Sequence, residues 1–294
     1  SDIICKFSEP LISCRYLSWF LVSYKNVVPF RLVPEPIINT LGLDDNLFKF
    51  ITKSSKLTPI RKTSIELEKN LAEYVGVKHC VTCGNGTDAI MIALMALGVK
   101  LGDEIIVPSF TYAASAEPIS LLGAVPVFAE VDERTFNLDI EDVKNRFTSK
   151  TKGIIATSLY GQSPSFNEIN DFAKKNNLFL MEDGAQSFAA NMHKEKSCSL
   201  TDIAATSFFP TKPLGCYGDG GAIFTNDDQL GLFARQISSH GQAQKYEHIR
   251  LGVNSRLDTI QAAILLEKLK IFDEEIILRN SIAERYFLYV DNPL

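Results

Sequence analysis

The stretch Ser207-Phe-Phe-Pro-Thr-Lys212, continued by Pro213-Leu-Gly-Cys-Tyr-Gly-Asp-Gly-Gly221, places a lysine between an apolar run and a cluster of glycines. Residues 203–209 have the length and composition of a buried strand, so Lys212 is expected on the turn that follows it. A second apolar run ends in Met181-Glu-Asp183, and Asp183 is 29 positions upstream of Lys212. A lysine and an aspartate therefore each follow a predicted strand.

Apolar runs of strand length alternate with helical patterns along most of the chain. The runs are continuous rather than alternately apolar and polar, which is typical of strands covered on both faces. The predicted strands are 79–83, 104–108, 125–129, 153–157, 178–181, 203–209 and 221–225, and the helical patterns are 64–75, 88–97, 166–176 and 257–286. This order predicts an α/β fold with a mainly parallel sheet flanked by helices, whose ligands bind at the carboxyl ends of the strands.

Lys212 and Asp183 are the residue types that pyridoxal phosphate chemistry requires. A lysine can hold the aldehyde cofactor as a Schiff base, and a carboxylate can keep the pyridine nitrogen protonated, which makes the ring an electron sink. Lys212 could instead be an ordinary solvated loop lysine, and Asp183 could be a helix N-cap. The apolar strands before both residues and the glycines after Lys212 favour the chemical interpretation.

A glycine-rich turn, Gly84-Asn-Gly86-Thr87-Asp88, precedes an apolar helix. Its amides and the Thr87 hydroxyl could take a phosphate at the helix N-terminus, and Ser207 could add a hydrogen bond. A simple helix start is the alternative. Because the helix dipole contributes only about 0.3 to 2 kcal/mol, covalent attachment, ring stacking and the Asp183 pair must share the binding.

Three further side chains could complete the site. Tyr112 lies past a predicted strand end, where an aromatic side chain could stack on the pyridine face or simply fill the core. Asn254 and Arg256 lie at the start of the last helical pattern. Arg256 could clamp a substrate carboxylate in bidentate fashion, although solvent exposure is the ordinary state of an arginine.

Composition narrows the classes of partner. The 294 residues carry a formal net charge of −5 and therefore no basic footprint for nucleic acid or an anionic membrane surface. Six cysteines lack the density of a disulfide framework, which favours a reducing cytoplasm. Cys80 and Cys83 form a lone C-x-x-C inside a predicted strand, so we expect them to pack in the core and predict no metal.

The motifs together resemble the DegT/DnrJ/StrS family of nucleotide-sugar aminotransferases, which are fold-type I pyridoxal phosphate enzymes. The resemblance spans about residues 64–288. Five motifs carry it in order: Gly-Asn-Gly-Thr87-Asp-Ala, Pro-Ser-Phe-Thr-Tyr112, Glu-Asp183-Gly-Ala-Gln186-Ser, Ser207-Phe-Phe-Pro-Thr-Lys212-Pro-Leu-Gly and Gly-Val-Asn254-Ser-Arg256-Leu-Asp.

The resemblance implies a role for each of these residues. Lys212 is implied as the catalytic Schiff-base residue, with Asp183 at the ring nitrogen, Gln186 near the ring hydroxyl and Tyr112 stacked on the ring. Further cofactor contacts are implied for Gly86, Thr87, Asp88, Ser207 and Asn254, with Thr87 and Ser207 at the phosphate, and substrate contacts for Thr211 and Arg256. Asn254 and Arg256 are implied to reach the neighbouring subunit's site, so that the active unit is a homodimer.

Within the family, the sequence is most similar to bacterial enzymes that aminate UDP-2-acetamido-2-deoxy-3-oxo-glucuronate for surface polysaccharide synthesis, such as that of lipopolysaccharide O-antigen. The resemblance implies a UDP-sugar substrate and glutamate as amino donor. Another nucleotide keto sugar or a non-catalytic remnant of the family are the alternatives. The dehydratases of the family carry histidine in place of the lysine, so Lys212 argues against that activity.

The sequence predicts three regions. Residues 1–60 form an atypical N-terminal segment punctuated by prolines, residues 61–256 a large cofactor-binding α/β domain, and residues 257–294 a long helix leading to a truncated C-terminal domain. Family members usually carry a Gly- and Tyr-containing turn where this chain has Lys56-Leu-Thr-Pro-Ile-Arg-Lys62, and they continue beyond Leu294 into a small domain. We therefore expect the chain to be a fragment or an imperfect gene product.

Overall fold

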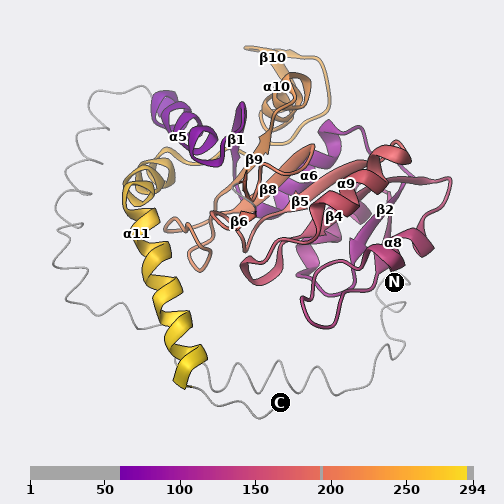
Figure 1. Ribbon diagram of the computed structural model, residues 1–294. Helices are drawn as coiled ribbons and strands as arrows, with labels where there is room; N and C mark the ends of the chain where they lie inside the picture. The colour runs from indigo at the N-terminus through magenta and orange to yellow at the C-terminus, as the bar shows by residue number, and fades with distance from the viewer. Residues whose placement is uncertain (1–59, 193–194, 290–294) are drawn as a thin grey trace, which may run out of the picture. The chain divides into compact units, whose positions relative to one another are not determined.

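The computed structural model describes residues 60–192 and 195–289 (Figure 1). The atypical segment predicted over residues 1–60 lies outside this part of the chain, apart from its last residue. Within these two ranges, no helix combines the length and the apolar character that crossing a bilayer requires.

The described residues alternate between helices and short strands. The helices are α5 (Ile60–Val75), α6 (Gly86–Ala96), α7 (Glu117–Leu121), α8 (Ile140–Arg146), α9 (Phe166–Lys175), α10 (Asp228–Ile237) and α11 (Thr259–Tyr289), with 3-10 turns η1 (Ala113–Ser115) and η2 (Leu159–Gly161). The strands are β1 (His79–Cys83), β2 (Glu104–Pro108), β3 (Val125–Ala129), β4 (Thr151–Thr157), β5 (Phe179–Asp183), β6 (Asn191–Met192), β7 (Glu195–Lys196), β8 (Ile203–Ser207), β9 (Gly221–Thr225), β10 (Gln242–Gln244) and β11 (Glu247–His248).

A seven-stranded sheet organises these elements in the order β1-β9-β8-β5-β4-β2-β3. The neighbours from β8 through β3 pair in parallel, whereas β9 runs antiparallel to both β8 and β1. The predicted mainly parallel sheet is therefore confirmed. Because the strands β8, β5, β4 and β2 run the same way, their carboxyl ends lie along one edge.

Helices cover both faces of the sheet. Ile105 and Val107 of β2 pack in a core with α6, α7 and α10, whereas Ile106 between them packs on the other face with α8 and α9. On that second face, α5 and α11 cover the half of the sheet that contains β1, β9 and β8. Figure 1 shows these two helices beside each other next to β1. The continuous apolar runs of the sequence match strands buried on both faces.

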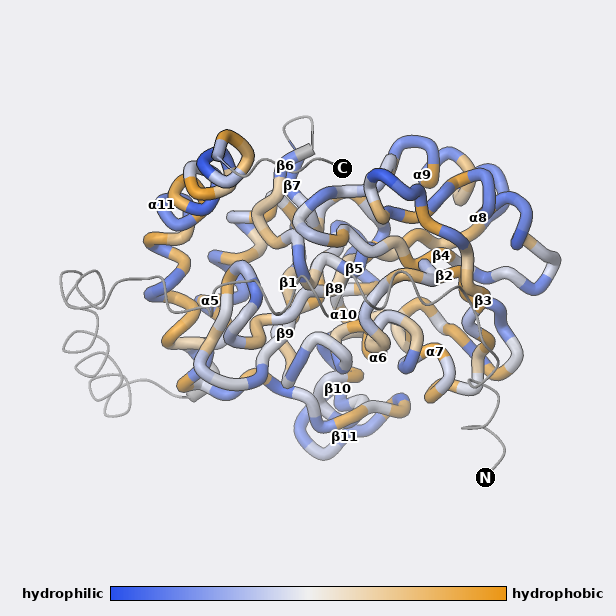
Figure 2. Tube along the Cα trace, turned by 90° about the horizontal axis from the view of Figure 1, so that it is seen from below, coloured by the Kyte–Doolittle hydropathy of each residue, from blue (hydrophilic) through white to orange (hydrophobic). Residues whose placement is uncertain are grey.

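α11 mixes apolar and polar residues along its length (Figure 2). Its first half supplies buried side chains to the core, including Leu265 and Phe272. The Phe188 ring lies between that helix and α5, with centroids 5.8 Å from both Phe272 and Tyr74. Phe188 follows β5 by a few residues, so this aromatic cluster anchors the segment that begins at Asp183.

The two cysteines of β1 face opposite sides of the sheet. Cys80 belongs to the core that contains α5 and α11, and Cys83 belongs to the core that contains α6. Both thiols are buried, and burial raises the pKa of each above its ordinary value. Side chains on opposite faces of a strand cannot converge on one ion, and both positions match the packing role predicted from the sequence.

Candidate active site

Asp183 is the last residue of β5 and lies at the edge where the parallel strands end. The ladder places it beside Thr157 of β4 and Ala205 of β8. Its side chain is buried, with a relative exposure of 5%. A carboxylate in such a position needs donors, because burial without hydrogen bonds costs several kcal/mol.

Two donors reach the Asp183 carboxylate. The Ser115 hydroxyl donates to Oδ2 at 2.6 Å and the Ala185 amide donates to Oδ1 at 3.1 Å. Burial raises the pKa of Asp183, whereas these hydrogen bonds and the charge of Lys212 act in the opposite direction. The lysine and the aspartate singled out in the sequence thus lie close enough to interact.

Lys212 lies on a tight turn after β8. Its amide donates to the Phe209 carbonyl at 2.8 Å, and a β-carbon on Gly215 would come within 2.7 Å of the Pro210 carbonyl oxygen. The glycine therefore permits a close approach that a larger residue would prevent. The Lys212 side chain is half-buried, between the exposed Thr211 and the core residue Leu214.

α11 holds the same turn from outside. Arg279 Nη2 donates to the Pro213 carbonyl at 3.2 Å, and the Tyr217 amide donates to Gln261 Oε1 at 2.9 Å. The Lys268 ammonium donates to the Gly215 carbonyl, and burial lowers the pKa of Lys268. The helix that follows the predicted large domain therefore fixes the segment that carries Lys212.

The glycine-rich turn meets the end of β8. Asn85 caps α6 by accepting a hydrogen bond from the Asp88 amide at 2.8 Å, which leaves the amides of Gly86 and Thr87 at the helix start. A β-carbon on Gly86 would be 3.2 Å from Ser207 Oγ. Amides at a helix N-terminus and a neighbouring hydroxyl are the donors that a phosphate requires.

Gln186 follows Asp183 closely in the chain, and Tyr112 lies close in the chain to its hydrogen-bond donor Ser115. Gln186 Oε1 accepts a hydrogen bond from the Tyr160 amide at 3.0 Å, which fixes the orientation of its side-chain amide. Tyr112 immediately precedes the 3-10 turn that contains Ser115, and its side chain is 73% exposed. An exposed aromatic ring next to the donor of Asp183 is available for stacking on a ligand.

Asn254 and Arg256 are exposed and flank a buried serine. Ser255 is 2% exposed, and its Oγ accepts a hydrogen bond from the Gly84 amide at 2.9 Å. Successive side chains of an extended segment point in opposite directions. Ser255 therefore supports the glycine-rich turn of its own chain, and its two neighbours point away from it.

The structure gives a supporting role to a residue next to Asp183 that the sequence analysis did not assign. Glu182 is fully buried, and its carboxylate accepts hydrogen bonds from Ser158 Oγ at 2.7 Å, Ser197 Oγ at 2.6 Å and the Cys198 amide at 2.7 Å. Burial raises the pKa of Glu182, and these hydrogen bonds oppose that effect. The sequence signal for Glu182 was its position beside Asp183 at the end of an apolar run, because a charged residue that continues a buried strand needs buried hydrogen-bond donors.

These residues fit pyridoxal phosphate. The end of β5 offers a buried carboxylate to a ring nitrogen, Lys212 offers an amine nearby, and the narrow turn at Gly86 offers helix amides to a phosphate. The carboxylate, the amine and the helix amides lie along one edge of the sheet. They match a ligand with a cationic ring nitrogen, an aldehyde and an anionic group.

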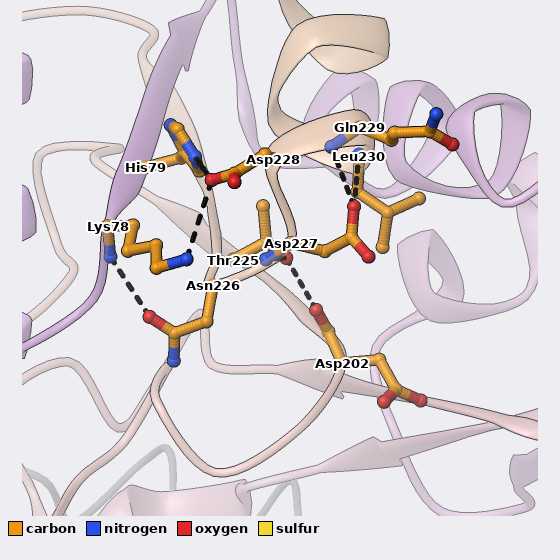
Figure 3. A network of polar contacts seen from close by, with 9 residues as sticks. All are labelled: Lys78, His79, Asp202, Thr225, Asn226, Asp227, Asp228, Gln229 and Leu230. Carbon is orange, nitrogen blue, oxygen red and sulfur yellow. Dashed lines mark hydrogen bonds and ion pairs between the residues drawn. The ribbon is translucent and has the colours of Figure 1, made fainter.

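The opposite edge of the sheet carries a different network (Figure 3). Thr225 Oγ1 donates to the Asp202 carbonyl at 2.6 Å, and Asp227 caps α10 by accepting hydrogen bonds from the Gln229 and Leu230 amides. Lys78 and His79 contact Asp228 on the surface. These contacts join the start of β1, the end of β9 and the start of α10. They include none of the predicted site residues.

Comparison with known proteins shows the family of the chain. The model of the DegT/DnrJ/EryC1/StrS aminotransferase family matches residues 44–288. A UDP-2-acetamido-2-deoxy-3-oxo-D-glucuronate aminotransferase of Pseudomonas aeruginosa is 58% identical over 223 residues, which are 76% of this chain and 62% of that protein. The chain thus spans less than two thirds of that relative's length.

Solved structures agree with these sequence matches. A DegT DnrJ EryC1 StrS aminotransferase from Brucella abortus superposes with a TM-score of 0.80 at 40% identity, over 85% of this chain and 69% of that one. The ntda protein of Bacillus subtilis with bound cofactor PMP superposes with a TM-score of 0.76 at 30% identity, over 83% of this chain and 57% of that one. The fold-type I arrangement predicted from the motifs is confirmed.

Proposed function

Because this chain belongs to the DegT/DnrJ/EryC1/StrS aminotransferase family, we propose that it is a pyridoxal phosphate-dependent aminotransferase of nucleotide sugars. The observation that carries the proposal is the buried Asp183 carboxylate within electrostatic reach of Lys212. The bound PMP of the Bacillus subtilis structure and the 58% identity to the Pseudomonas enzyme support the cofactor and the reaction.

When bound, pyridoxal phosphate supplies an aldehyde that condenses with amines and a ring that takes up electrons. Asp183 would hold the proton on the ring nitrogen, and Tyr112 would cover one ring face. The Gly86 and Thr87 amides, together with Ser207, would hold the phosphate end; the Asp88 amide is already used by Asn85, and its carboxylate would repel the phosphate. Gln186 would lie near the ring hydroxyl. Lys212 Nζ takes the proton from the substrate carbon that bears the amino group and returns one during the reverse transfer.

The substrate pair that fits best is glutamate and UDP-2-acetamido-2-deoxy-3-oxo-glucuronate. Both molecules carry a carboxylate, which a guanidinium binds in bidentate fashion, and Arg256 is the candidate for this contact. Thr211 is the second candidate for a substrate contact. The name of the Pseudomonas relative supports this keto sugar over other nucleotide sugars. The product would serve surface polysaccharide synthesis, including that of lipopolysaccharide O-antigen, and both substrates are cytoplasmic metabolites.

A homodimer would complete the site. Asn254 and Arg256 are exposed and point away from the buried Ser255 of their own chain. The nearby Tyr246, Ile249 and Leu251 expose 80%, 53% and 86% of their surface. Exposed apolar side chains close in sequence to two exposed polar ones are typical of an interface between subunits. We therefore assign Asn254 and Arg256 to the neighbouring subunit's site.

Absorbance tests the cofactor assignment. The purified protein mixed with pyridoxal phosphate should gain the visible absorbance of a lysine-bound cofactor, and Lys212→Ala should not. An unchanged spectrum in Lys212→Ala would overturn the assignment of Lys212. Glutamate consumption with a UDP-linked 3-keto sugar then tests the reaction, and cofactor binding without any turnover would favour a non-catalytic member of the family.

A further inference from the structure

Three hydroxyl groups form a line that ends on Asp183. Ser115 Oγ lies 2.6 Å from Asp183 Oδ2, Thr111 Oγ1 lies 2.8 Å from Ser115 Oγ, and Thr157 Oγ1 lies 3.1 Å from Thr111 Oγ1. The line crosses three elements, since Thr157 ends β4, Thr111 follows β2 and Ser115 ends η1. Ser115 and Thr157 are buried.

The proton count fixes the direction of this line. An ionised carboxylate only accepts hydrogen bonds, so Ser115 must donate its single hydroxyl proton to Asp183. Ser115 can then only accept from Thr111, and Thr111, having donated its proton, can only accept from Thr157. Each donor in such a chain polarises the next, which strengthens the terminal hydrogen bond in a buried site.

We propose that Thr157, Thr111 and Ser115 are positioning residues that form a directional chain of hydrogen bonds, which keeps Asp183 ionised and aimed at the ring nitrogen of the cofactor. The inference rests on the proposed function and deepens it. With Oδ2 held by Ser115 and Oδ1 held by the Ala185 amide, the carboxylate cannot rotate freely, and its remaining lone pairs stay available to a ligand.

The backbone around these residues is satisfied without the hydroxyls. The Ser115 amide donates to the Tyr112 carbonyl at 3.0 Å, and Thr157 is paired in the sheet with Asp183. The neighbouring carboxylate, Glu182, takes its hydrogen bonds from a separate set of donors on Ser158, Ser197 and Cys198. The line of hydroxyls therefore ends on Asp183, whose pKa the charge of Lys212 also acts to lower.

A pair of ring analogues tests the proposal. The protein stripped of cofactor is titrated by calorimetry with pyridoxal phosphate and with 1-deazapyridoxal phosphate, in which a CH group replaces the ring nitrogen. Ser115→Ala should lower the affinity for pyridoxal phosphate by about tenfold, because a hydrogen bond to a charged group is lost. Thr111→Val should lower this affinity by about threefold, because Thr111 acts through Ser115. Neither substitution should lower the affinity for the deaza analogue.

Two matched variants serve as controls. Thr111→Ser keeps the hydroxyl and should retain the wild-type preference for pyridoxal phosphate over the deaza analogue. Thr225→Val removes a buried hydroxyl at the opposite edge of the sheet, where Thr225 Oγ1 donates to the Asp202 carbonyl (Figure 3), and should lower stability without changing the preference.

The outcomes separate the possible failures. If Ser115→Ala and Thr111→Val weaken both compounds equally, the hydroxyls are structural and the proposal is overturned. Unchanged affinity for both compounds in both variants overturns it as well. If the wild-type protein binds neither compound, the proposed function itself fails and this inference fails with it. If Ser115→Ala does not fold, the comparison of Thr111→Val with Thr111→Ser decides.

Discussion

Gly86, which opens α6, lies so close to Ser207, which ends β8, that a β-carbon on residue 86 would stand 2.7 Å from the Ser207 β-carbon. Real β-carbons do not approach other atoms this closely, so the two segments meet only because residue 86 has no side chain. Packing therefore requires glycine at position 86 of the glycine-rich turn, in addition to the expected ligand.

Gly86→Ala should push the start of α6 away from β8. We expect a loss of about 2 kcal/mol in the free energy of unfolding, as for other overpacked cores, together with weaker binding of pyridoxal phosphate. Urea unfolding and cofactor titration measure the two effects. Ser207→Gly opens the same space, so the double variant Gly86→Ala with Ser207→Gly should lose less stability than the sum of the single losses. Strictly additive losses would contradict the contact.

The sequence predicted the strands well where apolar residues run without interruption. Strands 79–83, 104–108, 125–129 and 221–225 have the predicted bounds. β8 ends at Ser207 rather than at residue 209, because the Phe208 carbonyl accepts a hydrogen bond from the Cys216 amide and the Phe209 amide donates to Ser207 Oγ. β5 continues through Glu182 and Asp183, because buried donors satisfy carboxylates that normally end a strand.

The sequence singled out the residues that we propose to react but not those that support them. Lys212 and Asp183 stand out because each follows an apolar run, and such a run can be recognised in a short segment of the sequence. Ser115 and Thr157 bond to partners 68 and 46 positions away in the chain, respectively, and serines and threonines are ordinary at strand ends. Only the arrangement of β2, β4 and β5 in the sheet brings these hydroxyls together.

Glu68 links three elements beneath the glycine-rich turn. Its Oε1 accepts hydrogen bonds from the Thr82 amide at 2.9 Å and the Thr82 hydroxyl at 3.0 Å, and its Oε2 pairs with Arg235 at 2.9 Å. Glu68→Ala should lower the free energy of unfolding by about 2 kcal/mol, because it leaves a buried amide unpaired. Chemical unfolding measures the loss.

The surface pair of Glu267 with Lys270 provides the comparison for Glu68. Both pairs join a carboxylate to a cation at hydrogen-bond distance, but the Lys270 side chain is 65% exposed. Glu267→Ala should cost less than about 1 kcal/mol, as is usual for solvated ion pairs. Equal losses for Glu68→Ala and Glu267→Ala would show that the buried contacts to Thr82 contribute nothing.

Glu182 should make the stability of the protein depend on pH. Burial raises its pKa above the ordinary value of 4.5, so the folded state binds more protons than the unfolded state as the pH rises past that value. The contribution of Glu182 is therefore fully present below its unfolded pKa and is lost as the pH rises through its folded pKa. Glu182→Gln has no such proton to lose.

The stability of Glu182→Gln relative to wild type should therefore improve as the pH rises from about 5 to about 8. Asp183 is shifted in the same direction but is present in both proteins, so it largely cancels in the comparison. Urea midpoints at several pH values provide the measurement. A relative stability that worsens with rising pH would mean that the three hydrogen-bond donors outweigh the burial of the carboxylate.

Mixing two inactive variants tests whether the neighbouring subunit completes the site. If Lys212 comes from one chain and Arg256 from the other, a mixed dimer of Lys212→Ala and Arg256→Ala has one site with both side chains and one site with neither. Unfolding and refolding equal amounts together should restore roughly one quarter of the wild-type rate, since half of the dimers are mixed and each has one intact site. Transaminase activity with glutamate is the measurement, and each variant refolded alone is the control. A mixture no more active than its components would place Arg256 in the site of its own chain or outside the site altogether.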